Sequence, residues 1–247
     1  MILTFMRHPP IDESDERCIG HTDVALSPAG WAALLPLAER ACRLRPDRVL
    51  CSDLQRCQLL GEAIATRLGL AAEPNATWRE VNFGMWENRT WSDIQSTEPR
   101  VLGEWLADFD KVSPPGGESF QQLQARVLSA IRSQITEPQS DIGLPPVLQG
   151  ESSTGVSAVV PGESGTGVSP VVSSTGETRV LRPHYLVVTH AGVIRAAASA
   201  FTGAPLRNAF ERAVPYGSLT SFSWDGGRRS PLRFAVDIEP LAQGRVT

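Results

Sequence analysis

Two of the four histidines in the sequence follow directly after short apolar runs. His8 comes after the run Ile2 to Met6 and Arg7, and His190 comes after the run Tyr185 to Thr189. Short, continuously apolar runs are typical of strands buried on both faces of a parallel sheet. Both histidines are therefore expected at the carboxyl ends of strands, where the crevice of an open α/β sheet binds ligands.

Two arginines are expected to face the same crevice. Arg7 adjoins His8, and Arg56 lies near the start of a helix that follows the apolar run Arg48 to Cys51. A guanidinium group matches phosphate oxygens in a bidentate way, and two of them with an imidazole offset a dianion without a metal ion. Each residue taken singly is more often a packed or solvated side chain, but together they predict a phosphate pocket.

Helices and strands that would position these residues alternate along the chain. Ser27 and Pro28 provide an N-cap and an N1 proline for one helix, and apolar residues at helical spacing predict a second helix from Leu54 to Leu68. Ser119, with Gln122 three residues later, resembles a capping box. Further elements are expected as a helix from Ser119 to near Thr136, a helix at about 193–201 and strands near 219–224 and 232–237. The alternation predicts an α/β fold.

The segment from Pro138 to about Arg182 has a different composition. Gly, Ser, Pro, Thr and Val dominate it, aromatic residues are absent, and the sequence of 150–160 recurs in similar form at 162–172. Two short copies are too few for a solenoid, and the segment is poor in large apolar side chains. We interpret 138–182 as a disordered surface insertion within a single domain that spans residues 1–247.

Composition excludes several classes of function. With 23 Lys and Arg against 27 Asp and Glu, the formal net charge is -4, so no broad basic field favours nucleic acid or an anionic membrane. Nowhere do about 18 uncharged apolar residues run together, so no membrane span is expected. The apolar start of the chain is too short for the core of a signal peptide.

The four cysteines lack paired CxxC spacing, so no zinc site is expected. We expect free thiols in a reducing cytoplasm.

The whole arrangement resembles the histidine phosphatase superfamily, the phosphoglycerate-mutase-like fold, whose first strand ends in an Arg-His pair and whose late strand ends in a second histidine. The match includes 51–56, 80–86 and 115–119 as well. Within the superfamily, the segments 7–10, 18–26, 81–87 and 115–119 look most like the α-ribazole phosphatases of cobalamin assembly. The resemblance implies a three-layer α/β/α domain with a mostly parallel central sheet.

Three positions depart from the pattern of many members. Pro9 stands where Gly is frequent, which fits the α-ribazole phosphatase variety, and Ala191 also stands where Gly is frequent. Ser14 replaces a polar Asn seven residues after the arginine. Ser14 is shorter than Asn, and we retain it as a candidate phosphate ligand.

By resemblance, His8 attacks phosphorus to form a phosphohistidine, and water then releases phosphate. Arg7, Arg56 and His190 would hold the transferring phosphoryl group and stabilise its charge. Neither a metal ion nor a cofactor is required. The partner implied is a small-molecule phosphate ester, α-ribazole 5'-phosphate or an adenosylcobalamin phosphate precursor.

Glu80 occupies the position of the family's general acid, which would protonate the leaving alkoxide. Glu118 is the competing carboxylate, although its place just before a helix gives it a structural role. Three tryptophans, Trp86, Trp91 and Trp105, could line a pocket for a flat base, but packing is the commoner use. His21 and Asp23 lie in a loop soon after the first strand and could contact substrate, although Asp23 equally suits a turn. His184 is expected at the surface.

Competing functions remain open at this point. The same parts would serve a phosphatase for sugar phosphates, nucleotides or phosphoserine, because specificity lies in loops. A mutase requires a closed site, and no lid like that of the mutases is recognised in the sequence. A non-catalytic phosphate-binding or scaffolding protein, with the repeat as its docking site, is disfavoured because Arg7, His8, Arg56, Glu80 and His190 are all present.

Overall fold

The computed structural model of the protein describes residues 1–12, 16–135, 182–223 and 233–235. Ser14 and the predicted insertion at 138–182, apart from its last residue, lie outside the described residues. The assignment of that segment as an insertion in one domain therefore stays a prediction.

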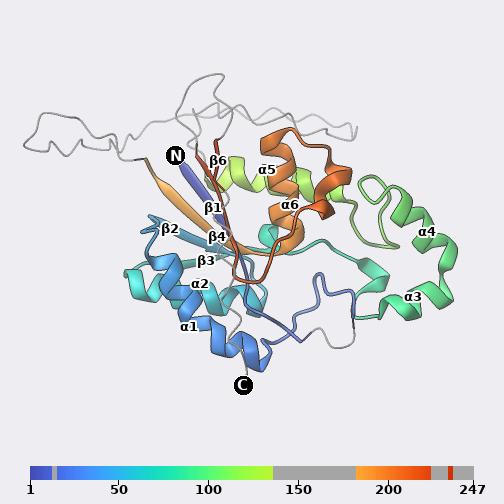
Figure 1. The fold of residues 1–247 in the computed structure, drawn as a ribbon, viewed down its shortest axis with the longest axis horizontal. Coiled ribbons are helices and arrows are strands. Elements are labelled where there is room, and N and C mark those ends of the chain that lie inside the picture. Colours follow the sequence, from blue (N-terminus) through green and yellow to red (C-terminus); the bar gives the residue numbers. More distant parts are fainter. Residues whose placement is uncertain (13–15, 136–181, 224–232, 236–247) are drawn as a thin grey trace, which may run out of the picture.

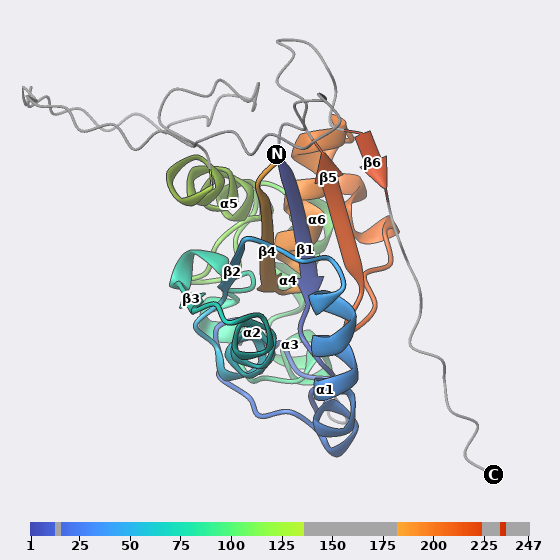
Figure 2. The same ribbon diagram turned by 90° about the vertical axis from the view of Figure 1, so that its left-hand side faces the viewer.

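A six-stranded sheet forms the centre of the fold, with the strand order β3-β2-β4-β1-β5-β6. Figure 2 shows β2, β4, β1, β5 and β6 following one another in this order. Neighbours among β1 to β4 pair in parallel, whereas β5 is antiparallel to β1 and β6 is antiparallel to β5. The strands are β1 (Ile2–Arg7), β2 (Arg48–Cys51), β3 (Ala72–Pro74), β4 (His184–Thr189), β5 (Leu219–Ser223) and β6 (Arg233–Ala235).

Helices cover both faces of this sheet, with α1 and α2 on one side and α5 and α6 on the other (Figure 1). The expected three-layer α/β/α architecture with a mostly parallel sheet is therefore confirmed. The α-helices are α1 (Pro28–Cys42), α2 (Gln55–Leu68), α3 (Trp91–Thr97), α4 (Pro99–Ala107), α5 (Phe120–Gln134) and α6 (Ala191–Thr202). Three short 3-10 helices are η1 (Ala76–Trp78), η2 (Gly84–Trp86) and η3 (Leu206–Glu211).

Alternate side chains of the central strands supply two hydrophobic cores. Phe5 and Val187 point toward α5 and α6, while Met6 and Val188 point toward α1 and α2, and all four are fully buried. A continuously apolar strand is required because both faces of the sheet are covered. This burial fixes the register of β1 against β4, from Ile2 beside His184 to Arg7 beside Thr189.

Local sequence signals define several element ends as expected. The Ser27 hydroxyl accepts a hydrogen bond from Gly30 N, and α1 begins with Pro28. Gly69 ends α2 in the left-handed conformation, with φ 69°. Ser119 and Gln122 form the predicted capping box at the start of α5.

A smaller core holds α3 and α4 away from the sheet, at the right of Figure 1. It is built around Trp86 and Trp105, whose rings meet edge to face at 5.7 Å between centroids. Trp91 stacks on Trp105 at 5.8 Å with an interplanar angle of 23°. The sequence analysis did not identify α3 or α4.

All four cysteines are free thiols. Burial raises the pKa of Cys18 and of Cys51 to about 12, so neither thiol ionises at neutral pH. No helix among the described residues is long and apolar enough to cross a membrane.

His184 was expected at the surface, and this expectation is wrong. Its side chain is buried at the start of β4, where Nδ1 donates to Leu44 O at 3.1 Å. Nε2 therefore accepts from the Thr4 hydroxyl at 2.8 Å. Burial lowers the pKa of His184 below the usual 6.5.

The buried His184 makes the stability of the fold sensitive to acid. The unfolded chain takes up the proton near the usual pKa of 6.5 but the folded protein does not, so its contribution is present above that pH and is lost as the pH falls. We expect His184→Gln to lower the free energy of unfolding by about 1 kcal/mol at alkaline pH, through the loss of a buried hydrogen bond. Because Gln does not titrate, the difference should shrink in acid. Urea unfolding across this pH range measures it, and a pH-independent difference would contradict the assignment.

Candidate active site

The two strand-end histidines lie side by side. His8 follows β1 and His190 follows β4, and the parallel register of these neighbouring strands brings both to the same edge of the sheet. Their rings lie 5.1 Å apart between centroids at an interplanar angle of 61°. Both are buried, with 3% and 0% of their surface exposed. The structure thus places both histidines next to each other at the carboxyl ends of β1 and β4.

His8 presents an unprotonated nitrogen to the site. Its Nδ1 lies 2.7 Å from Pro9 O, and because a carbonyl oxygen only accepts, Nδ1 carries the proton. Burial, followed by the charges of Arg56 and Arg7, lowers the pKa of His8 well below its usual value. The ring is therefore neutral at physiological pH, and Nε2 keeps a lone pair available for nucleophilic attack.

His190 has the opposite tautomer. Arg56 Nε donates to its Nδ1 at 3.4 Å, so the ring proton resides on Nε2. The Cys57 sulfur lies 3.4 Å from that nitrogen. Burial, followed by the charges of Arg56, His8 and Arg7, lowers the pKa of His190 well below its usual value. A neutral His190 can thus donate a hydrogen bond from Nε2.

Arg56, at the start of α2, is only 1% exposed. Its terminal nitrogens donate to Gly20 O at 2.7 Å and to Thr22 O at 2.8 Å. These two carbonyls and His190 hold the guanidinium group at a fixed angle. Burying a cation is costly without such partners.

Arg7, the last residue of β1, is held from another direction. Its Nη1 donates to Val214 O at 2.8 Å, and its guanidinium carbon lies 3.7 Å from the centre of the Tyr216 ring. The same ring lies 5.3 Å from that of His8 between centroids. Segment 214–216, which leads into β5, therefore supports both Arg7 and His8.

Glu80 is fixed against the start of α6. One carboxyl oxygen accepts from Val81 N at 2.9 Å and the other from Gly192 N at 3.1 Å. A Cβ atom at position 192 would lie 2.1 Å from the Glu80 carboxyl, so only glycine permits this approach. The Glu80 carbonyl accepts from His21 Nε2 at 3.0 Å and from Arg126 at 3.1 Å.

Glu118, the competing carboxylate, is engaged elsewhere. It forms an ion pair with Arg126 and accepts from Asn82 N at 2.9 Å. Through Arg126 it supports the segment that carries Glu80. Asp23 caps the start of α2, where its carboxylate accepts from Gln55 N at 2.8 Å.

One cavity of about 340 Å³ brings the predicted site residues together. Of the six candidates, five line it, and the sixth, Ser14, lies outside the described residues. The five are Arg7, His8, Arg56, Glu80 and His190. Among the described residues, no group of three or more His, Cys, Asp or Glu side chains is arranged to hold a metal ion.

Aromatic residues from distant segments form much of the cavity wall. They are Phe83, Trp91, Phe120 and Phe210. Of the three tryptophans considered from sequence, only Trp91 lines the cavity, whereas Trp86 and Trp105 are buried in the small core. Phe210, which is 48% exposed on η3, could not be placed at the site from sequence because no local pattern marks it.

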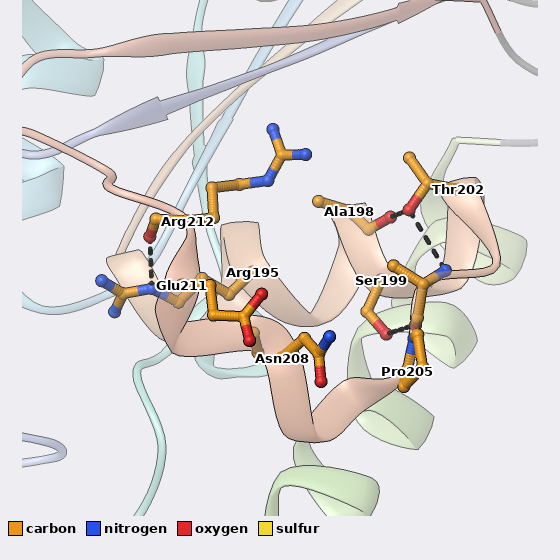
Figure 3. Close-up of a pocket in the computed structure, with 10 residues that line it drawn as sticks. Arg195, Ala198, Ser199, Thr202, Pro205, Asn208, Glu211 and Arg212 are labelled. Carbon is orange, nitrogen blue, oxygen red and sulfur yellow. Dashed lines mark hydrogen bonds between the residues drawn. The ribbon is translucent and has the colours of Figure 1, made fainter.

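Arg195 is a further basic residue that lines this cavity, and it was not predicted from the sequence. It lies five residues after His190 on α6, and it also lines a second cavity of about 330 Å³ between α6 and η3. Figure 3 shows its Nε donating to Arg212 O, a bond of 3.2 Å, with the terminal nitrogens directed away from Asn208 and Ser199. Its guanidinium carbon lies 5.0 Å from the centre of the Phe210 ring. Its spacing from His190 gave no signal, because residues that share a helix face are three or four positions apart.

Comparison with known proteins agrees with this geometry. The sequence profile of the Histidine phosphatase superfamily (branch 1) matches residues 3–143 and 159–237. The chain belongs to this superfamily, as its strand-end histidines suggested.

Curated relatives match only part of the chain. The bifunctional protein Rv2228c of Mycobacterium tuberculosis is 32% identical over 127 residues, which make up 51% of this chain and 35% of that protein. The probable phosphoglycerate mutase GpmB of Salmonella paratyphi C is 30% identical over 135 residues, 54% of this chain and 63% of that protein. The matched part thus spans about a third of the first relative and less than two thirds of the second.

Solved structures share the fold over nearly the whole chain. The α-ribazole phosphatase from Shigella flexneri superposes with a TM-score of 0.69 at 21% identity, covering 97% of this chain and 100% of that one. A mycobacterial glucosyl-3-phosphoglycerate phosphatase in complex with VO3 gives a TM-score of 0.65 at 21% identity, with 96% of each chain covered. At these identities the likeness concerns the fold. Since the matched names include phosphatases and a mutase, membership leaves both reactions open.

The opposite tautomers of the two histidines can be measured. We expect ¹⁵N NMR of the labelled protein at neutral pH to show a protonated Nδ1 and an unprotonated Nε2 for His8, and the reverse for His190, because Pro9 O and Arg56 Nε impose these states. Loss of the signals in His8→Ala and His190→Ala assigns them. A doubly protonated His8 at neutral pH would contradict the geometry.

Proposed function

We propose that the protein is a phosphomonoesterase that acts through a phosphohistidine formed on His8. The observation that carries the proposal is the neutral His8 ring, with its Nε2 lone pair, in a cavity that also contains Arg7, Arg56 and His190. A nucleophile beside two guanidinium groups and a neutral hydrogen-bond donor suits a phosphate dianion. Phosphoryl transfer depends mainly on positioning and electrostatic stabilisation.

In the proposed first step, His8 Nε2 attacks phosphorus and the bond from phosphorus to the ester oxygen breaks. Glu80 gives a proton to the departing alkoxide. In the second step, Glu80 takes a proton from water, whose oxygen attacks phosphorus, and the bond to Nε2 breaks to release phosphate. Arg7, Arg56 and His190 donate hydrogen bonds to the phosphoryl oxygens throughout. The proposed compartment is a reducing cytoplasm, where four free thiols persist.

Our first candidate substrate is α-ribazole 5'-phosphate or an adenosylcobalamin phosphate precursor. Support comes from the motifs that resemble α-ribazole phosphatases and from the aromatic residues that line the cavity, Phe83 and Trp91 among them, since aromatic side chains pack against flat bases.

Trapping the intermediate tests the proposed reaction. We expect enzyme mixed with ³²P-labelled substrate, with EDTA present and an alkaline quench, to carry label on His8, because phosphoramidates survive base and fail in acid. His8→Ala should abolish labelling and phosphate release, while Arg56→Ala should retain a weak remnant. Label on serine or aspartate, a need for a divalent ion, or isomerisation without phosphate release would refute it.

The role of Glu80 can be separated from binding by changing the leaving group. Glu80→Gln keeps the shape of the side chain but cannot donate a carboxylic proton, so we expect alkyl esters such as α-ribazole 5'-phosphate to slow by about 100-fold or more. Aryl phosphates should be nearly spared, because an aryl oxide leaves without a proton. The matched control is Glu118→Gln, which should show no dependence on the leaving group. Equal slowing of both substrates by Glu80→Gln would exclude it as the acid.

Arg195 favours a second candidate, esters whose leaving group carries another anion, such as phosphoserine. Among the described residues, its Nε is bonded to Arg212 O and no acceptor contacts its terminal nitrogens. Burial lowers the pKa of Arg195 and the charge of Glu80 raises it, which places a partly desolvated cation near the proposed acid. A carboxylate on the leaving group would satisfy the free donors.

A pair of matched substrates decides between the two candidates. Phosphoserine and phosphoethanolamine differ by one carboxylate, and we expect Arg195→Gln to lower kcat/KM for phosphoserine by about 10-fold, the value of a hydrogen bond to a charged group. Phosphoethanolamine should change little, and Arg195→Lys should recover part of the loss. If both substrates slow equally, the second candidate is withdrawn.

A further inference from the structure

The carboxylate of Glu87 accepts hydrogen bonds from the short loop 20–22 and from Phe83. One oxygen accepts from His21 N at 2.8 Å and from Phe83 N at 3.0 Å. The other accepts from the Thr22 hydroxyl at 2.6 Å, from Thr22 N at 2.9 Å and from Gly20 N at 3.2 Å. Five donors thus converge on a single side chain that does not line the cavity.

Glu87 holds this loop as an anion. Burial raises its pKa, but the hydrogen bonds from Thr22, His21 and Phe83 outweigh burial and keep the pKa below its usual value. Hydrogen bonds to a charged acceptor are about twice as strong as neutral ones. The backbone of residues 20–22 is therefore tied firmly to the segment that follows Glu80.

The same loop holds Arg56 from its other side. While the N–H groups of Gly20 and Thr22 point to Glu87, their carbonyls accept from the two terminal nitrogens of Arg56 at 2.7 and 2.8 Å. The loop is also confined by packing, since a Cβ atom at Gly20 would lie 2.0 Å from Val81 O. A shift of the loop must therefore move the guanidinium group.

The bonds to the loop also determine which donors of Arg56 remain for a ligand. A guanidinium group has five N–H donors. Within the described residues, Nε is used by His190 and each terminal nitrogen donates once to the loop, so one N–H on each terminal nitrogen is left. The direction of this remaining pair depends on the two loop carbonyls.

We propose that Glu87 is a positioning residue of the phosphate site: it holds residues 20–22 so that the Gly20 and Thr22 carbonyls aim the free N–H pair of Arg56 at the phosphoryl group. The inference rests on the proposed function in one respect, the role of Arg56 as a phosphate ligand. Glu87 itself touches neither substrate nor reacting atoms.

Glu87→Gln is the direct test, because an amide cannot replace this carboxylate. Each carboxylate oxygen accepts at least two donors, whereas the amide would turn an N–H₂ group toward one set of them. The loop must then shift, and a misplacement of about 1 Å at a catalytic group costs on the order of 100-fold in rate. We expect kcat/KM for 4-nitrophenyl phosphate to fall by about 10- to 100-fold, with a similar loss of affinity for orthovanadate.

A double-mutant cycle distinguishes positioning from general destabilisation. In an Arg56→Lys background, where the forked donor is already lost, Glu87→Gln should cost less than about 3-fold more, because interacting residues are not additive. Glu98→Gln is the matched control: Glu98 accepts from Trp86 Nε1 at 3.1 Å and pairs with Arg89, outside the cavity. It should lower Tm without changing orthovanadate affinity.

Thr22→Val provides a milder variant should Glu87→Gln fold poorly. It removes only the hydroxyl that donates to Glu87 at 2.6 Å, and we expect a loss of about 3- to 10-fold in orthovanadate affinity, in proportion to one hydrogen bond. The positioning role is refuted if Glu87→Gln and Thr22→Val both keep wild-type orthovanadate affinity, or if the full loss persists in the Arg56→Lys background. If the wild-type protein neither binds orthovanadate nor releases phosphate, the proposed function fails, and the positioning role fails with it.

Discussion

The structure depends on keeping two imidazole rings neutral between two guanidinium groups. Arg56 is buried, and the rings of His8 and His190 lie 5.1 Å apart beside it. A further positive charge in this space would be poorly solvated and repelled, so the pKa values of both rings are lowered and each ring stays neutral with a single proton. The positive charges of Arg7 and Arg56 repel each other in an empty site, and a bound dianion would offset this repulsion. The scaffold must therefore supply neutral acceptors for the arginines rather than carboxylates, which would compete with the ligand.

Backbone carbonyls supply acceptors of this kind to both arginines. Arg56 bonds to the carbonyls of residues 20 and 22, and Arg7 bonds to the carbonyl of Val214. Glu80 lines the cavity itself, whereas two other carboxylates act from behind the lining residues: Glu87 on the loop behind Arg56, and Glu118 through Arg126 behind Glu80. Glu87 and Glu118 thus act on the site through the residues that they hold.

The sequence was most informative where the signal is local. Apolar runs followed by polar residues marked the strand ends, so His8, His190 and the start of α2 with Arg56 were found from spacing alone. Most of the aromatic wall was not found: Phe210 reaches the cavity through the packing of η3, and Trp91, which was considered for a pocket, could not be told from Trp86 and Trp105 by sequence. No role was assigned to Glu87 from the sequence, since its partners at 20–22 lie 65 to 67 residues earlier.

His184 was misjudged for a related reason. A polar residue at the edge of a strand is usually solvated, and only the neighbouring strand, 180 residues away in sequence, supplies the Thr4 hydroxyl that makes its burial acceptable. A single sequence shows which side chains are polar but does not show which of them meet. Long-range pairing therefore separates what was predicted here from what was not.

The helix α5 ends, and the strand β4 begins, at the edge of the sheet that is remote from His190. Arg48, the first residue of β2, donates to Gln134 O at 2.8 Å, so α5 ends beside the amino-terminal edge of the parallel strands, and β4 begins at that same edge. The two described ends of the connection between α5 and β4 therefore lie on the side of the sheet away from the reacting groups. In evolutionary terms, the two points where the chain leaves α5 and enters β4 are separated from the residues on which selection for chemistry would act.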